Sequence, residues 1–197
     1  MPALISDEQT ERDRQSLLDA AEVLLYAKGI QAVGMDEIRA EAGLALKRIY
    51  ALYASKEELV VGMLRRRDIR WRADLAEYVE RATDPRQRVL AVFDWLHQWF
   101  CQPGFRGCAW VNAHGELGAS SEAIATEVSA HKAAFHDQIA AWVAATNPSA
   151  CEGVHLLAEG AIVSAGITND PDVALRARSA AEALLAAAGH PAGMTQA

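Results

Sequence analysis

The chain has 197 residues, of which 51% are hydrophobic, and its formal net charge is −7. This length is sufficient to bury a real core, and the acidic balance excludes a protein that is basic overall. The charge is unevenly placed, because residues 1–72 hold 12 basic and 12 acidic side chains whereas the remainder holds 7 and 14.

The three cysteines, Cys101, Cys108 and Cys151, make an odd count, and we expect free thiols in a reducing compartment. No apolar run approaches the roughly 18 residues that span a bilayer. The start of the chain, "MPALISDEQTERDRQ", has neither a basic segment nor a signal-like apolar stretch. The sequence therefore predicts a cytoplasmic protein that does not enter a membrane.

Apolar residues recur at helical spacing, and Gly and Pro fall mostly between these segments. We predict an all-α protein of about nine helices. The expected helices span Glu8–Lys28, Met35–Ala42, Ala45–Tyr53, Lys56–Arg81, Pro85–Cys101, Cys108–Leu117, Ser121–Thr146, Pro148–Ile167 and Pro171–Ala188. The tail "HPAGMTQA" is expected to fray.

The second and third expected helices are separated by two residues, Gly43 and Leu44. A hairpin this tight is typical of a helix-turn-helix unit, and Gly43 supplies the backbone freedom that the turn needs. Such a unit places its second helix in the major groove of DNA. The neutral N-terminal third of the chain is what a DNA-binding head on an acidic body would show.

The third expected helix has two faces. Leu46, Ile49 and Tyr53 form an apolar stripe, whereas Lys47 and Arg48 point elsewhere. A bland amphipathic helix with two solvated cations would show the same spacing. The pattern alone leaves both readings open.

The segment Ser16–Leu64 resembles the N-terminal domain of the TetR family of bacterial transcriptional regulators. The matching residues are Ala20, Ala21, Gly29, Ile38, Ala42, Gly43, Tyr50, Tyr53 and Lys56 to Leu59. The total length and the helix count are also similar to those of the family. The resemblance implies an N-terminal helix-turn-helix domain over residues 1–55, with the motif at about 34–53, and an effector-binding and dimerisation domain over residues 56–197.

The resemblance also implies roles for individual residues. Lys47 and Arg48 would lie near base edges or phosphates, with Arg48 the first candidate for a base contact because Arg commonly reads guanine. Tyr50 and Lys56 would contact the DNA backbone, and Tyr53 would be core.

Three positions depart from the family's pattern. Gly34 and Ala45 stand where Ser or Thr usually caps the second and third helices, and an Ala cap costs about 1 kcal/mol. Arg39 replaces a small residue and would either contact a phosphate or be solvated. These changes concern the affinity and sequence of the operator, and we expect Gly34, Arg39 and Ala45 to border the DNA.

Aromatic residues concentrate between Val89 and Trp110. Large aromatic side chains dominate protein cores, but together with nearby polar groups they also form ligand pockets. The segment "FRGCAWVNAHGELG" resembles a stretch that borders the effector cavity in some TetR-family members. The expected pocket residues are Trp95, Trp99, Phe100, Phe105, Cys108, Trp110, Asn112, His114 and Phe135.

Cys108 has two readings. It is expected at a helix N-terminus, a position that lowers thiol pKa values, and some related regulators sense electrophiles or oxidants through such a cysteine. A buried inert thiol is the alternative.

No compact metal-ligand motif is present. His97 and Cys101 lie four residues apart, Cys108 and His114 are candidates to join them, and His131 and His136 are interpreted as surface residues. No cofactor loop or nucleophile motif supports an enzyme built on Cys108 or on His114 and Glu116. We therefore expect no metal, no cofactor and no catalytic activity.

The last two long helices are rich in small residues, which would suit an intramolecular layer. The family resemblance implies instead a homodimer interface made by these two helices. We expect a homodimeric regulator that binds a palindromic double-stranded DNA operator, a repressor released by a small apolar or aromatic ligand. The alternatives are a regulator that ignores ligands and a small Cys/His enzyme.

Overall fold

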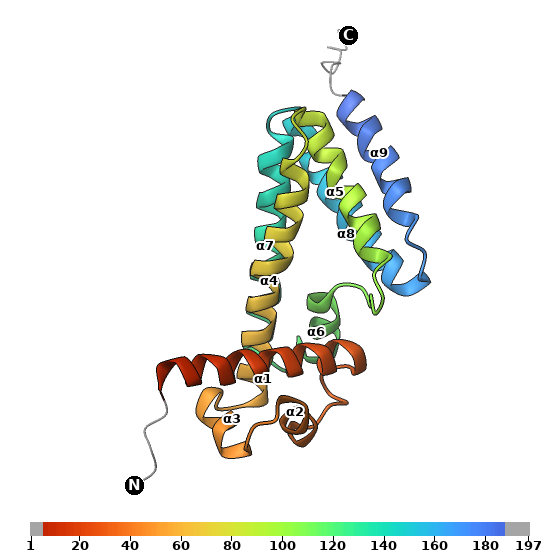
Figure 1. Cartoon of the computed structure of the whole chain (residues 1–197). Coiled ribbons are helices and arrows are strands. Elements are labelled where there is room, and N and C mark those ends of the chain that lie inside the picture. Colours follow the sequence, from red (N-terminus) through yellow and green to blue (C-terminus); the bar gives the residue numbers. More distant parts are fainter. Residues whose placement is uncertain (1–5, 188–197) are drawn as a thin grey trace, which may run out of the picture. The chain divides into compact units, whose positions relative to one another are not determined.

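The computed structural model describes residues 6–187, which fold into nine α-helices and one 3₁₀ turn without a β-strand (Figure 1). The all-α prediction is confirmed. The helices are α1 (Asp7–Lys28), α2 (Met35–Ala42), α3 (Leu46–Leu52), α4 (Lys56–Glu80), α5 (Pro85–Phe100), α6 (Ala109–Leu117), α7 (Glu122–Val143), α8 (Cys151–Thr168) and α9 (Val173–Ala187), and the 3₁₀ turn is η1 (Pro148–Ala150).

At every helix end that lies among the described residues, the predicted boundary agrees with the observed one within three residues. Residues 148–150 form a separate 3₁₀ turn before α8, and Asn147 precedes this turn with a φ of −140° and a ψ of 89°. The tail "HPAGMTQA" and Ala188, the predicted last helical residue, lie outside the described residues.

The chain divides into two compact units. The first unit contains the residues up to Ile69 together with Ala109–Ala130. The second contains Arg70–Cys108 together with the chain from His131 onward. Both α4 and α7 continue from one unit into the other. These units are defined by compactness, whereas the boundary predicted after residue 55 separates a DNA-binding domain from an effector-binding domain. That functional boundary stays a prediction.

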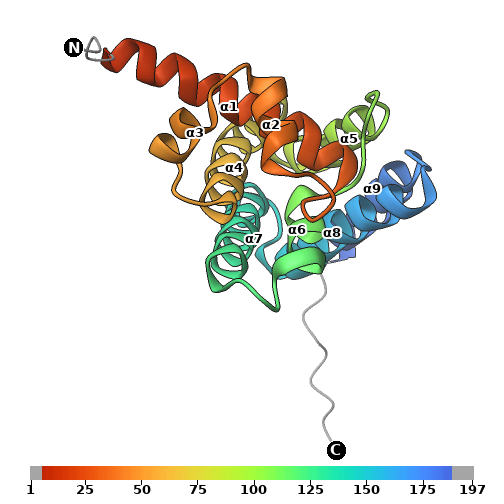
Figure 2. The same ribbon diagram turned by 90° about the horizontal axis from the view of Figure 1, so that it is seen from below.

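Helices α1, α2 and α3 of the first unit are shown in Figure 2. Local signals set the ends of α1 and α2. The Ser6 hydroxyl caps α1 by accepting a hydrogen bond from the Gln9 N–H, as an N-cap Ser commonly does. Gly29 ends α1 with a φ of 96°, and Gly43 ends α2 in the left-handed region with a φ of 65°. The turn between α2 and α3 therefore depends on Gly43, as the sequence predicted.

The core of the helix-turn-helix lies between α1, α2 and α3. Leu17, Ala21, Ile38 and Ile49 are fully buried. Tyr53, directly after α3, packs so closely on α4 that a Cβ added at Gly62 would lie 2.7 Å from the Tyr53 ring. Tyr53 therefore seats α3 against α4.

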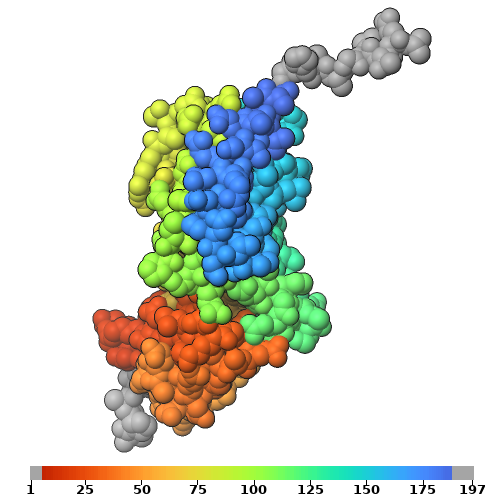
Figure 3. All heavy atoms as spheres, turned by 90° about the vertical axis from the view of Figure 1, so that its right-hand side faces the viewer, coloured from red at the N-terminus to blue at the C-terminus, as the bar shows by residue number. Residues whose placement is uncertain are grey.

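In the second unit, α9 packs on both α5 and α8, and α5 also contacts α8 (Figure 1). Asp84 caps α5 by accepting a hydrogen bond from the Gln87 N–H at 2.8 Å, and Pro85 occupies its first turn. Small residues allow one very close approach, because a Cβ at Gly166 would lie 2.8 Å from the Gly107 Cα. One side of α9 faces outward along its length (Figure 3).

Among the described residues, one segment, Pro148–Thr168, is long and apolar enough to cross a membrane by length and composition. The expectation that no segment reaches this length is therefore wrong. The core helix of a soluble protein passes the same test, and α8 packs on α5 and α9 within its unit.

Candidate functional site

The outward face of α3 carries the residues expected to meet DNA. Lys47 and Tyr50 are exposed, Tyr50 by 46%, whereas Ile49 on the opposite side is fully buried. Leu46 was predicted to belong to the buried stripe but is 39% exposed. It is the first residue of α3.

Arg48 does not share this exposed face. Its Nε donates to Asp13 Oδ2 at 2.7 Å, and its Nη2 donates to Thr10 Oγ1 at 2.8 Å. Only 18% of the Arg48 side chain is exposed. The hydrogen bond from Arg48, followed by one from Gln9, holds the pKa of the Asp13 carboxyl below its usual value. Arg48 therefore ties α3 to α1.

Lys56 is also engaged inside the first unit. Its ammonium donates to the backbone carbonyls of Ile30 and Val33, at 2.5 Å each. Burial lowers the pKa of Lys56, and the nearby Glu116 carboxylate partly opposes that shift. The side chain thus ties the start of α4 to the loop between α1 and α2.

The same loop is held from α6 by Glu116. Its two carboxylate oxygens accept hydrogen bonds from the backbone N–H groups of Ile30 at 2.9 Å and Gln31 at 2.8 Å. The Glu116 backbone carbonyl accepts a third bond from Gln31 Nε2. Segments 85 residues apart in sequence are therefore joined within one compact unit.

The three positions that depart from the family's pattern are all exposed. Gly34 and Ala45 are the N-caps of α2 and α3 and have no side-chain oxygen to offer. Arg39 lies 3.4 Å from Asp36 on the same helix, with 44% of its side chain exposed. An exposed pair of this kind contributes little to stability, so the Arg39 guanidinium is available to another anion.

Three of the predicted pocket residues pack around Trp71, a residue that was not predicted to belong to the pocket. The Trp71 ring meets Trp95, Trp99 and Phe135 edge-on, with centroid distances of 5.2, 5.4 and 5.1 Å. His131 also lies against Trp71 and is buried, so its interpretation as a surface residue is wrong. Helices α4, α5 and α7 thus contribute side chains to one aromatic core.

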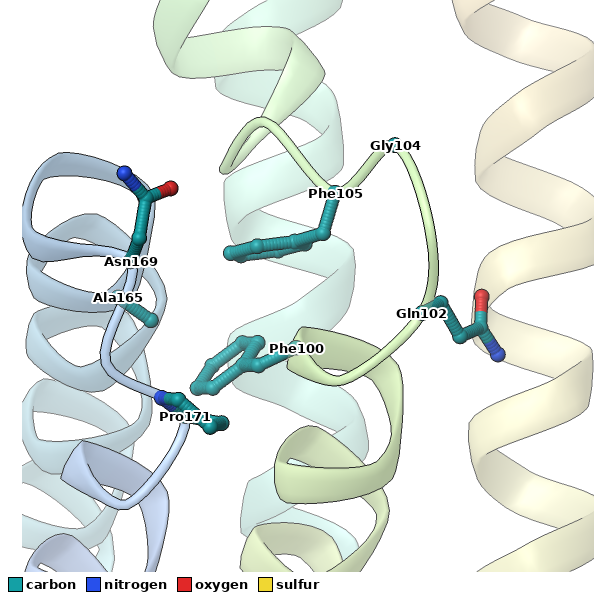
Figure 4. A pocket seen from close by; sticks show the side chains of 7 residues that line it. All are labelled: Phe100, Gln102, Gly104, Phe105, Ala165, Asn169 and Pro171. Carbon is teal, nitrogen blue, oxygen red and sulfur yellow. The ribbon is translucent and has the colours of Figure 1, made fainter.

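A cavity of about 180 Å³ opens beside this core in the second unit (Figure 4). Its lining consists of Phe100, Gln102, Gly104, Phe105, Ala165, Asn169 and Pro171. The rings of Phe100 and Phe105 point into the same space, whereas the Gln102 side chain points away from them (Figure 4). The sequence analysis predicted Phe100 and Phe105 but not Asn169, which α8 presents at its left-handed C-cap.

The remaining predicted pocket residues are placed elsewhere. Trp110 is buried in the first unit, where Asn112 and His114 lie exposed on α6. Cys108 is 5% exposed, and its sulfur accepts a hydrogen bond from Lys132 Nζ at 3.5 Å. Of the predicted pocket residues, Phe100 and Phe105 therefore line the cavity in Figure 4.

A second cavity of about 200 Å³ lies wholly within the first unit. It is lined by Ile30, Gln31, Lys56, Glu57, Val60, Leu117, Ser120, Ser121 and Ile124. No sequence pattern predicted this cavity, because its walls come from three segments that are distant along the chain.

Residues 17–63, which contain the helix-turn-helix, match the family model described as bacterial regulatory proteins, tetR family. Over most of its length the chain also shares the fold of solved TetR-family regulators. The N-terminal domain of the chain is that of the TetR family. Together with the shared fold of solved TetR-family regulators, this domain makes the chain a DNA-binding transcriptional regulator and not an enzyme.

Two solved TetR-family structures are similar to nearly the whole chain. A TetR-family transcriptional regulator from Streptomyces coelicolor is 28% identical, with a TM-score of 0.82 over 89% of this chain and 95% of that one. A putative TetR transcriptional regulator from Streptomyces avermitilis is 26% identical, with a TM-score of 0.78 over 89% and 97%.

A curated relative is the HTH-type transcriptional activator FasR of Mycolicibacterium smegmatis, 34% identical over 84 residues. That match covers 43% of this chain and 38% of the relative. The chain thus matches well under half the length of this relative.

Three residues that position the helix-turn-helix were not predicted from the sequence. Asp13 and Thr10 hold Arg48, and Glu116 holds the loop before α2. All three are common polar residues on amphipathic helices, and their partners lie at least 35 residues away. Only the folded chain brings them together.

Proposed function

We propose that this TetR-family regulator is a cytoplasmic repressor that binds a palindromic operator as a homodimer and is released by a small apolar or aromatic ligand. The observation that carries the proposal is the exposed face of α3. Its inner side is fixed by Ile49 and Arg48, which leaves Lys47 and Tyr50 directed outward.

Within this proposal, Lys47 is the first candidate to contact a base or phosphate. Tyr50 donates its hydroxyl to a phosphate, since phosphate contacts position a recognition helix and base contacts give specificity. Arg48 and Lys56 act by fixing α3 and α4, because their charged groups already have partners. Gly34, Arg39 and Ala45 border the DNA as exposed positions.

The proposed effector site is the cavity lined by Phe100 and Phe105. Two rings with a centroid distance of 4.9 Å present apolar surface, and the Asn169 amide offers one donor and one acceptor. Its volume of about 180 Å³ is below the usual 300–1,000 Å³ of ligand sites, so it suits a compact ligand.

The proposed dimer uses α8 and α9. Large apolar side chains are exposed on these helices: Leu156, Val163, Ile167, Leu175 and Leu184. A second copy covering them would remove this apolar surface from water, which is favourable. Two heads would then read two half-sites about one helical turn apart.

Ligand and operator are proposed to favour different conformations of the dimer. A ligand shifts an equilibrium only by its differential affinity for the two conformations, and the coupling is reciprocal. The ligand should therefore weaken operator binding by the same factor as the operator weakens ligand binding.

The test begins with genomic fragments selected by the purified protein. We expect the selected sites to be palindromic and transcription from the adjacent promoter to rise when the regulator is removed. A fall in transcription on removal would show an activator, which is what the relative FasR is. Selection of no sequence above background would contradict the proposed operator binding.

A regulator that ignores ligands is the second candidate, favoured by the close packing of Trp71 with Trp95, Trp99 and Phe135. A thermal-shift screen with compact aromatic compounds separates the two. Under our proposal a hit raises the melting temperature of the wild type but not of Phe105→Ala, and it weakens operator binding. A screen without any such hit would favour the second candidate.

A further inference from the structure

Three side chains with metal-binding atoms gather where α7 passes the start of α8. His136 projects from α7, and Cys151 and Glu152 are the first residues of α8. One ligand atom from each lies within 4.8 Å of the others. His136 Nε2 is 2.9 Å from Glu152 Oε1 and 4.0 Å from Cys151 Sγ.

These groups offer an imidazole nitrogen, a thiol sulfur and a carboxylate oxygen. This donor set suits zinc and similar first-row cations, whereas magnesium and calcium prefer oxygen alone. Bonds of about 2.0–2.3 Å to a tetrahedral ion place its ligand atoms roughly 3.5 Å apart. The distances from His136 Nε2 to Glu152 Oε1 and to Cys151 Sγ, 2.9 and 4.0 Å, lie on either side of that value. Small side-chain rotations would therefore bring the three ligand atoms to tetrahedral spacing.

The surroundings of His136 are those of a metal-binding histidine. Its other nitrogen, Nδ1, lies 3.4 Å from Asp137 Oδ1. A carboxylate on the far nitrogen orients the ring and fixes which nitrogen faces the metal. The His155 ring, 5.1 Å away and nearly perpendicular, packs against His136 and limits its movement.

The group is also accessible. Glu152 is 76% exposed at its side chain and His136 is 33% exposed. An ion can therefore enter from solvent, and water can complete a coordination shell that three protein ligands leave open. All three residues belong to the second compact unit.

We propose that His136, Cys151 and Glu152 bind one zinc-class divalent cation per chain, with water as the fourth ligand. The Cys151 thiol loses its proton to solvent on binding, because the thiolate is the ligand. The ion links α7 to the start of α8 and stabilises the second unit. The candidate ligands from the sequence, His97, Cys101, Cys108 and His114, take no part, whereas His136 was interpreted there as a surface residue.

The test is titration of the metal-free full-length protein with Co²⁺, followed by absorbance. We expect a thiolate-to-cobalt charge-transfer band that saturates at one ion per chain and disappears when Zn²⁺ is added. Cys151→Ser should abolish the band, whereas Cys101→Ser, the matched change at an exposed free cysteine, should leave it intact.

Asp137→Asn tests the geometry without removing a ligand. Loss of an outer carboxylate typically weakens metal binding about 10–100-fold, so the Co²⁺ dissociation constant should rise by that order while the charge-transfer band keeps its position. The absence of a band in the wild type, or a full band in Cys151→Ser, would overturn the proposal. Either result would show that His136 and Glu152 form an ion pair only.

Discussion

At the scale of single residues, the pair of Arg48 and Asp13 fixes the recognition helix. Asp13 has a depressed pKa in the folded state, so its contribution to stability is complete above the unfolded value of about 3.9 and is lost as the pH falls through the folded value. We expect Asp13→Asn to lower the urea midpoint at pH 7 and the difference from wild type to shrink toward pH 3.

The control for this prediction is Asp74→Asn, a change at an exposed carboxylate on α4. It should leave the urea midpoint close to that of the wild type at pH 7. An Asp13→Asn midpoint equal to wild type at pH 7 would show that the pair does not hold α3.

Gly62 is a second residue with a defined steric role. Its added Cβ would lie 2.7 Å from Tyr53 Cε1 and 2.9 Å from the Tyr53 hydroxyl oxygen. We predict that Gly62→Ala destabilises the protein by about 1–3 kcal/mol, because Tyr53 must leave its position. Urea unfolding measures this change.

Gly115→Ala is the matched control, since Gly115 is also helical, lies in the same unit and has open space around its added Cβ. Removing a glycine from a helix should stabilise the protein by roughly 0.5–1 kcal/mol. Equal effects of the two substitutions would exclude the proposed steric contact.

At the scale of elements, α6 holds the loop between α1 and α2 through Glu116. We predict that Glu116→Ala speeds amide hydrogen exchange at Ile30 and Gln31 by about tenfold or more, because hydrogen bonds to a charged group contribute roughly 1.5–3 kcal/mol. Glu122→Ala, at an exposed carboxylate in the first turn of α7, should leave both amides unchanged. Unchanged exchange at both amides in Glu116→Ala would show that Glu116 does not hold the loop.

The elements themselves were largely predictable from the sequence. Helical periodicity, Gly43 at the turn and Pro85 at a first turn act locally, so the pattern alone located them. Arg48 was expected to face DNA, yet it pairs with Asp13, 35 residues earlier. The burial of His131 and the exposure of Leu46 likewise depend on which other helices pack against these residues. The spacing of residues along the chain does not predict that packing.

The candidate pocket shows the same limit. Aromatic density located the neighbourhood of Phe100 and Phe105, because both lie on or beside one helix. Asn169 lines the cavity beside these rings, and the Trp71 ring meets Trp99. Both were missed, since each comes from another helix and only folding brings it to its partners. Asn112 and His114 were predicted from a local resemblance, but α6 places them in the other unit.

At the scale of the whole molecule, the proposed binding to a palindromic operator requires a dimer. Ile167 on α8 is 76% exposed and Val163 is 36% exposed in the single chain. We predict that Ile167→Glu halves the mass measured by light scattering, because a buried unpaired carboxylate disfavours the interface. Val23→Glu, at a residue of α1 that is 61% exposed, should leave the mass unchanged. An unchanged mass for Ile167→Glu would contradict the proposed interface.

The most direct test of the account is the affinity of Lys47→Ala for a selected operator, measured by fluorescence anisotropy. Loss of one base contact costs about 1–3 kcal/mol, so we predict that the dissociation constant rises about tenfold or more, with folding unchanged. Arg81→Ala, which removes one exposed positive charge from α4's C-terminal end, should bind as the wild type does. Wild-type affinity in Lys47→Ala would contradict the claim that the exposed face of α3 reads DNA.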